Sequence, residues 1–133
     1  MIIILFLGKN DSYIDIDASQ TEFPLAKKDK LKIVTYVTSY PEAILTWWFW
    51  QCTTFDDSKC QTPIAITNDD KYKISVTHLR DKVRMKLEIN SVTENDSGPY
   101  KLRAMNDPNT KEVNFTVNVE GMIYFFKIII IIF

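Results

Sequence analysis

The side chains that could do chemistry are few in this chain of 133 residues. Its single histidine, His78, precedes Leu79-Arg80-Asp81 in a predicted exposed turn, and no nucleophile stands at a recognisable spacing from it. Three pairs of neighbouring acids could act as paired carboxylates or calcium ligands: Asp15 and Asp17, Asp56 and Asp57, and Asp69 and Asp70. None belongs to the loop-plus-glutamate pattern of a calcium site, which favours solvated turn acids. The sequence therefore predicts no enzyme, no metal and no cofactor.

The two cysteines, Cys52 and Cys60, enclose a polar loop. Two cysteines are too few for a disulfide scaffold, and they lack the four-ligand spacing of a zinc site. They fit a single disulfide, which would place the protein in an extracytoplasmic compartment. Two free buried thiols are the alternative interpretation.

Length and composition limit the class of protein. A chain of this length forms one domain, with a core of about 100 residues plus tails. The formal net charge of −1 argues against nucleic acid or an acidic membrane as the main partner, because both attract strongly basic chains. Three glycines and 13% aromatic residues exclude a disordered or collagen-like chain.

Both ends of the chain are apolar, so the folded domain is expected over residues 12–120. Residues 1–8 lack a basic n-region and are interpreted as a short signal-peptide remnant. Residues 121–133 contain an apolar run of about 12 residues, whereas a membrane-spanning helix needs about 20, which favours a truncated membrane anchor. The alternative is that neither end belongs to the natural mature protein.

The segment between the two ends shows the period of β-strands. Apolar and polar residues alternate strictly over 83–89, and a similar pattern recurs along the chain. Predicted strands lie within 12–26, where a proline favours edge strands, and at 31–38, 44–51, 72–76, 83–89, 100–105 and 113–119. Six or seven short strands without helical periodicity predict an all-β, antiparallel sandwich.

Turn-forming residues at 95–98 lead into the strand that starts at Tyr100. Asp96, Gly98 and Tyr100 resemble the tyrosine corner of immunoglobulin-like domains, in which the tyrosine hydroxyl bonds to the backbone upstream. Together with the order of the strands, this corner resembles the I-set immunoglobulin domain over about residues 20–120. The resemblance implies recognition by a surface and no catalysis.

A second resemblance is confined to Trp48-Phe49-Trp50-Gln51-Cys52. The segment is similar to the Trp-Phe-Trp segment, followed by a cysteine-bearing loop, of membrane-proximal immunoglobulin domains in receptor tyrosine kinases of the VEGF/PDGF receptor family. It implies a disulfide between Cys52 and Cys60 in a growth-factor-receptor-like ectodomain at the cell surface. The alternatives are a secreted or surface adhesion domain with no kinase, and a fragment of a larger receptor.

The disulfide that joins the two sheets in immunoglobulin domains is absent. By the family's spacing its positions are Thr35, which precedes Trp47 by 12 residues, and Leu102, which follows Tyr100 by two. Packing of Leu102 against Trp47 or Trp48 must hold the sheets together instead. Trp47 fits this spacing and Trp48 fits the receptor segment; we favour Trp47 as the core tryptophan.

The tryptophans on the outer side of this strand form a candidate interface with a growth factor or another immunoglobulin domain. Trp48 and Trp50 would then present a large amphipathic patch of the kind found at interface cores. The alternative is that Lys101 or Arg103 of the neighbouring strand covers their rings.

The corner carries a second potential contact. In the resembled receptors, an arginine nine positions before the corner tyrosine pairs with an acid four positions before it, across the receptor dimer. Here Asp96 keeps the acid, but Ser91 stands in the place of the arginine. Asp96 is therefore expected only to brace the corner by hydrogen bonding.

Three sequons, at Asn10, Asn95 and Asn114, predict N-glycosylation of an extracellular protein. Asn114 lies on the polar side of its predicted strand, whereas Asn95 lies in the corner next to an aspartate and is expected to be a poorer acceptor. A basic face is predicted on the strand at 83–89. It is either a solvated surface or a site for a heparan-type polyanion, and it consists of Lys82, Arg84 and Lys86.

Overall fold

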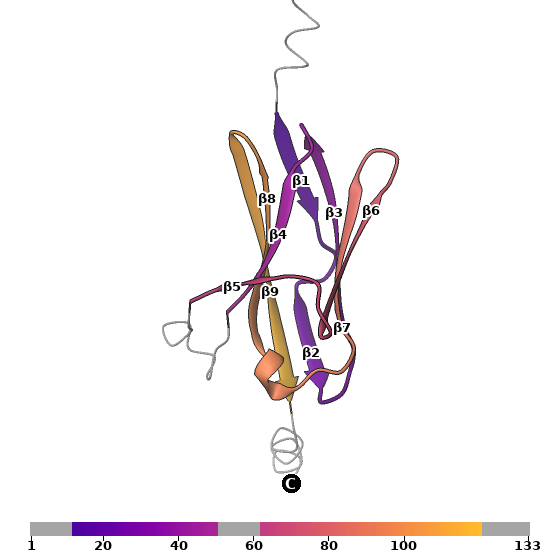
Figure 1. Cartoon of the computed structure of the whole chain (residues 1–133), viewed down its shortest axis with the longest axis vertical. Coiled ribbons are helices and arrows are strands. Elements are labelled where there is room, and N and C mark those ends of the chain that lie inside the picture. Colours follow the sequence, from indigo (N-terminus) through magenta and orange to yellow (C-terminus); the bar gives the residue numbers. More distant parts are fainter. Residues whose placement is uncertain (1–11, 51–61, 121–133) are drawn as a thin grey trace, which may run out of the picture.

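The computed structural model describes residues 12–50 and 62–120, which fold into two layers of strands (Figure 1). The strands are β1 (Tyr13–Asp17), β2 (Glu22–Ala26), β3 (Leu31–Tyr40), β4 (Ile44–Phe49), β5 (Ile64–Ile66), β6 (Tyr72–His78), β7 (Val83–Ile89), β8 (Gly98–Asn106) and β9 (Asn109–Glu120). A three-residue 3₁₀ helix, η2 (Glu94–Asp96), lies between β7 and β8. The prediction of an all-β sandwich is confirmed.

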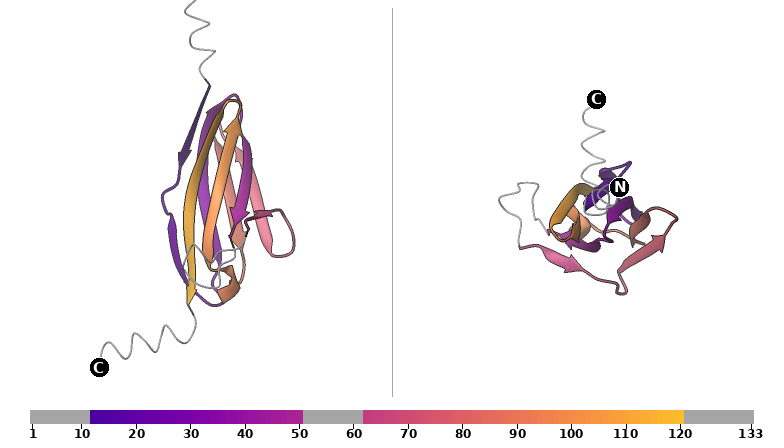
Figure 2. Two further views of the ribbon diagram at one scale, coloured as in Figure 1. Left: turned by 90° about the vertical axis from the view of Figure 1, so that its left-hand side faces the viewer. Right: turned by 90° about the horizontal axis from the view of Figure 1, so that it is seen from above.

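The two layers are a four-stranded sheet in the order β1-β3-β7-β6 and a five-stranded sheet in the order β2-β9-β8-β4-β5. Figure 2 shows the two sheets stacked along their length. One ladder departs from the expected antiparallel pattern, because β2 runs parallel to β9. After β1 the chain crosses to the other sheet without reversing, so β2 travels in the same direction as β9 (Figure 1).

The core lies between the sheets and is built from the side chains that point inward at every second position of the strands. Trp47 of β4 is 1% exposed, and its ring centroid lies 5.7 Å from that of Phe115 on β9. The other buried apolar residues are Ile14, Phe23, Leu31, Ile33, Val37, Phe49, Ile66, Met85, Leu87, Ile89, Val92, Tyr100, Leu102, Ala104, Val117 and Val119. Each large apolar side chain stabilises the fold by about 1.5–3 kcal/mol when buried, so packing alone can hold the sheets together.

The described residues contain nine strands, against the six or seven predicted. The region 12–26 contains two separate strands, β1 and β2. Strand β5 was not predicted, because its three residues are too few to show a period in the sequence. It forms because β4 offers an open edge, on which Ile66 pairs with Trp47 and Ile64 with Phe49. Strand pairing that depends on a distant neighbour leaves no local pattern to find.

Several predicted features lie outside the described residues. They are the apolar segments 1–8 and 121–133, the sequon at Asn10, the acids Asp56 and Asp57, and the cysteines Cys52 and Cys60. Within 12–50 and 62–120, none of the helical structure is long and apolar enough to cross a membrane.

Candidate functional site

The corner before β8 is held by a buried tyrosine. Gly98 has a φ of 143°, a region open to glycine and unfavourable for other residues, and this bend turns the chain into β8. Tyr100 is fully buried, and its hydroxyl donates a hydrogen bond of 2.8 Å to the carbonyl oxygen of Asp96. The structure thus places the three predicted corner residues in one hydrogen-bonded turn.

The carboxylate of Asp96 braces the same corner from inside. It is fully buried and accepts a hydrogen bond of 2.8 Å from the backbone N–H of Thr93. Its other oxygen lies 2.5 Å from Nζ of Lys71, which precedes β6. Lys71 was not predicted from the sequence, since it lies 25 positions before Asp96 and no motif in the chain links the two.

Alternation along β4 sends its tryptophans to opposite sides of the five-stranded sheet. Trp47 points into the core, whereas Trp48 is half-buried on the outer side, so the alternative assignment of Trp48 to the core is wrong. The Cζ atom of Arg103 lies 5.7 Å from the centroid of the Trp48 ring. In the same way, Nζ of Lys101 lies 4.9 Å from the centroid of the Trp50 ring. The structure therefore shows the alternative predicted for this surface, in which cations of the neighbouring strand cover both rings.

A single acid positions both of these cations. Glu112 of β9 accepts a hydrogen bond of 2.7 Å from Nε of Arg103 and lies 3.2 Å from Nζ of Lys101. The hydrogen bond from Arg103, together with Lys101, lowers the pKa of Glu112 although partial burial opposes the shift. We call Trp48, Trp50, Lys101, Arg103 and Glu112 the tryptophan face.

Apolar side chains continue this surface along the sheet. Ile44 of β4 pairs with Met105 of β8, and the two are 73% and 46% exposed. They lie on the same side of the sheet as Trp48, because positions two apart along a strand share a face. The surface therefore joins exposed aliphatic residues to tryptophan rings covered by cations.

The sequons within the described residues differ in their surroundings. Asn114 is exposed on β9 and pairs with Lys101, so a glycan there would lie beside the tryptophan face. Asn95 is exposed in η2, but the next residue, Asp96, is buried. The hydroxyl oxygen of Ser97 accepts a hydrogen bond of 2.8 Å from the N–H of Val119, which ties the third sequon residue to β9.

The predicted basic face lies on the outer side of the four-stranded sheet and contains an acid. Glu88 of β7 forms ion pairs with Lys30 at 2.8 Å and with Lys86 at 3.6 Å. The hydrogen bond from Lys30 lowers the pKa of Glu88. Lys82 lies over the ring of Tyr36, with Nζ 5.2 Å from the ring centroid. These contacts favour a solvated sheet surface over a heparan-type site.

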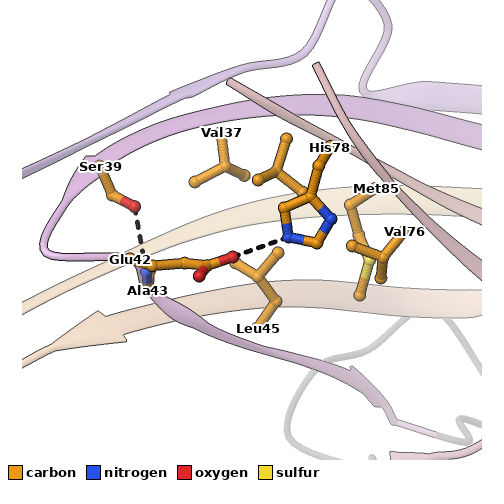
Figure 3. A pocket seen from close by; sticks show the side chains of 9 residues that line it. Val37, Ser39, Glu42, Ala43, Leu45, Val76, His78 and Met85 are labelled. Atoms are coloured by element: carbon orange, nitrogen blue, oxygen red, sulfur yellow. Dashed lines mark hydrogen bonds and ion pairs between the residues drawn. The ribbon is translucent and has the colours of Figure 1, made fainter. Parts of the chain in front are cut away.

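A small cleft opens between the sheets near the single histidine (Figure 3). Its volume is about 190 Å³, and its lining residues include Val37, Leu45 and Met85. His78 ends β6 and does not lie in a turn as predicted; its Nε2 atom is 2.8 Å from the carboxylate of Glu42. Both side chains are about two-thirds exposed, and such pairs contribute about 0–1 kcal/mol.

The acids predicted to lie in turns differ in their positions. Asp15 and Asp17 are exposed on β1, whereas Asp69 caps the start of β6 by accepting hydrogen bonds from the backbone. In the described parts of the chain, no three histidine, aspartate or glutamate side chains are grouped so that they could hold a metal ion.

Comparison with known proteins decides the family. The family described as the immunoglobulin I-set domain matches residues 25–119, most of the sandwich. The chain belongs to the immunoglobulin I-set family. The sequence search of curated proteins finds no match.

Solved structures share the fold of this I-set domain. The crystal structure of Dpr2 Ig1-Ig2 in complex with DIP-Theta Ig1-Ig3 matches with a TM-score of 0.64 and 17% identity. The match covers 80% of this chain and 32% of that one, so the I-set domain spans about a third of the length of its structural neighbour. At this identity the likeness establishes the fold. The narrower resemblance to VEGF/PDGF receptors gains no support from these comparisons.

The I-set domain lacks sulfur at both positions of the family's inter-sheet disulfide. Thr35 on β3 and Leu102 on β8 are fully buried in opposite sheets. The hydroxyl of Thr35 donates a hydrogen bond of 3.2 Å to the carbonyl of Met85, which satisfies its buried polar group within its own sheet. Leu102 is the register partner of Trp47 and adds to the apolar core.

The tyrosine corner should make the I-set domain sensitive to alkali. Burial raises the pKa of the Tyr100 hydroxyl. Burial opposes the charge of Lys71, but the hydrogen bond and the charge of Asp96 outweigh it and raise the pKa of Lys71. A raised pKa in the folded state means that the stabilisation is complete at neutral pH and is lost as the pH rises above about 10, where the unfolded chain releases its protons.

We therefore expect the free energy of unfolding to fall above about pH 10, and Tyr100→Phe to make this fall shallower by about 1.4 kcal/mol per pH unit. At pH 7 the same variant should cost about 1 kcal/mol, because the Asp96 carbonyl loses its hydrogen-bond donor. Urea unfolding of both proteins between pH 7 and 11.5 checks both effects. Equal slopes above pH 10 would contradict the role assigned to the buried hydroxyl.

Proposed function

We propose that this I-set domain is a non-catalytic protein-binding module, outside the cell or at its surface, and that the tryptophan face is its binding site. The observation that carries this proposal is the pairing of two tryptophan rings with Arg103 and Lys101 on one sheet surface. Tryptophan and arginine are the residue types most enriched among residues that dominate binding energy. Ile44 and Met105 extend the same surface with exposed apolar area.

The cations over the tryptophan rings favour a partner whose surface carries acidic groups over a partner whose surface is wholly apolar. Glu112 holds Arg103 and Lys101 in place, so these side chains lose little conformational freedom when a partner binds. Two cations and one anion give the surface a small positive charge. A partner with a carboxylate beside an apolar or aromatic group would fit this pattern.

The finer assignment concerns the protein in which the domain acts. We propose a receptor-type ectodomain, supported by the resemblance of Trp48-Phe49-Trp50-Gln51-Cys52 to VEGF/PDGF receptor domains. A growth factor or another immunoglobulin domain is then the expected partner. The structural neighbour supports the second, because it is a complex of Dpr2 Ig1-Ig2 with DIP-Theta Ig1-Ig3. An adhesion domain without a kinase fits the same surface.

The proposal predicts that binding depends on the tryptophan face. A multimer of the full chain should be tested against displayed ectodomains with immunoglobulin domains, with this chain included in the panel. Once a partner is found, Trp48→Ala and Arg103→Ala should each weaken its affinity about 30-fold, the loss of about 2 kcal/mol expected of a dominant contact. Surface plasmon resonance measures this loss.

The matched control is Arg84→Ala, which removes an arginine from the outer side of the other sheet. It should leave the affinity unchanged, and all three variants should keep a cooperative unfolding transition. If binding is lost with Arg84→Ala and retained with Trp48→Ala, the site lies on the four-stranded sheet and the proposal is wrong.

A further inference from the structure

Strand β6 forms one edge of the four-stranded sheet (Figure 1). It pairs with β7 on one side, and among the described residues no strand pairs with it on the other. In an antiparallel ladder, every second residue turns its N–H and C=O away from its neighbour. An open edge of this kind is a template for pairing with another chain.

Side chains from the segment before β6 fill part of this edge. The amide of Asn68 makes two hydrogen bonds with the backbone of Ile74: its oxygen accepts from the N–H at 2.6 Å, and its nitrogen donates to the C=O at 3.2 Å. These are the two bonds that a residue of a neighbouring strand would make. The Asn68 side chain thus occupies the place of a missing strand.

Asp69 does the same one step earlier along β6. Its carboxylate accepts a hydrogen bond of 2.7 Å from the N–H of Tyr72, and its own N–H donates one of 3.0 Å to the carbonyl of Tyr72. Because the backbone N–H and C=O groups of Tyr72 and Ile74 point to the open edge, strand alternation sends the backbone groups of Val76 and His78 to the same edge. Asn68 and Asp69 therefore cover the first half of the edge, and no other described strand pairs with the second half.

We propose that Asn68 is an edge-blocking residue, and that its removal allows two copies of this chain to join through antiparallel β6–β6 pairing centred on Ser75. The occupant is a second copy because β6 is complementary to itself in this register. Ile74 would face Val76 of the other copy, Tyr72 would face His78, and Lys73 would face Thr77. No two like charges lie opposite each other, and Ile74 and Val76 would make their ladder bonds with the second copy, while Tyr72 keeps its bonds to Asp69.

This inference concerns a different surface from the tryptophan face. The edge of β6 belongs to the four-stranded sheet, whereas Trp48 and Arg103 lie on the outside of the five-stranded sheet. Pairing at β6 would leave the proposed binding site open. Failure of either proposal can therefore be recognised without reference to the other.

The test uses the full chain with Cys52→Ser and Cys60→Ser as background. Asn68→Ala should shift the mass found by sedimentation equilibrium from the 15.5 kDa of one chain toward twice that value as concentration rises. Adding Ser75→Cys should then give a disulfide-linked dimer on oxidation, at a yield about tenfold above that of Ser75→Cys with Asn68 intact, because the amide bonds no longer compete with pairing. Asn90→Ala, an exposed asparagine after β7, is the matched control and should remain a monomer.

Lys73→Cys gives a second control on the same strand and the same side. In the proposed register the introduced cysteine faces Thr77 of the second copy and lies far from the cysteine at position 73 of that copy, so it should not cross-link. Asn68→Ser has a shorter side chain that cannot make both bonds, and it serves if Asn68→Ala does not fold. We call these two substitutions the opening variants, because each frees the edge of β6. Folded opening variants that stay monomeric, or dimers that cross-link equally well through Lys73→Cys, would overturn the proposal.

Discussion

A disulfide introduced by Thr35→Cys and Leu102→Cys should raise the free energy of unfolding by about 4 kcal/mol when it is oxidised, relative to the same variant when reduced. The chain-entropy relation gives about 4.4 kcal/mol for a loop closed between residues 35 and 102. Comparing the two redox states cancels the packing lost with Leu102 and the hydrogen bond lost with Thr35. For a domain of about 100 residues, this difference corresponds to about 20 °C in melting temperature.

The measurement is calorimetry with and without reductant, in a background of Cys52→Ser and Cys60→Ser so that only one pair can form. Thiol titration of the folded, oxidised variant should find no free cysteine. Two titratable thiols in a folded protein would show that positions 35 and 102 do not lie opposite each other. The reduced variant should still unfold cooperatively, since apolar packing already holds the sheets.

Trp47→Ala should destabilise the domain by about 3–5 kcal/mol, the cost of emptying a large buried site in a core. Trp47 is almost fully buried, packs on Phe115 and pairs with Leu102 where the family usually has sulfur. Since small domains are stable by about 5–15 kcal/mol in total, this loss would bring the protein close to unfolding at room temperature. Denaturant unfolding followed by circular dichroism measures the change.

Trp48→Ala is the matched control, because it removes the same side chain one position along the strand. Its ring is half-buried beneath Arg103, so the expected loss is about 1 kcal/mol. Trp47→Phe keeps most of the ring and removes an indole N–H that has no hydrogen-bond partner within the described residues, and it should cost less than Trp47→Ala. Equal losses for Trp47→Ala and Trp48→Ala would contradict the placement of Trp47 in the core.

Features that depend on neighbours in the sequence could be predicted. The strict alternation over 83–89 predicts β7, and its apolar positions Met85, Leu87 and Ile89 are buried as that period requires. The corner is local as well, because Asp96 and Tyr100 are only four residues apart. In both cases the sequence window contains all the atoms that decide the structure.

Features that depend on distant neighbours could not be predicted in this way. Lys71 reaches Asp96 only because β6 lies beside the corner in the fold. For the tryptophan face, the sequence left two outcomes open, and the register of β4 with β8 decides that Arg103 lies over Trp48. The amide of Asn68 gave no signal at all, since an asparagine in a turn is ordinary until the free edge beside it is known.

The parallel pairing of β2 with β9 has a mechanical consequence. Force that draws residue 12 away from residue 120 would slide β2 along β9, because both strands run in the same direction while their chain ends point to opposite poles of the sandwich (Figure 1). All the hydrogen bonds between Glu22–Ala26 and Thr116–Glu120 would then be loaded together. A hairpin pulled at its two ends would, in contrast, open one hydrogen bond at a time. A domain without a covalent link between its sheets can in this way still carry tension along a chain.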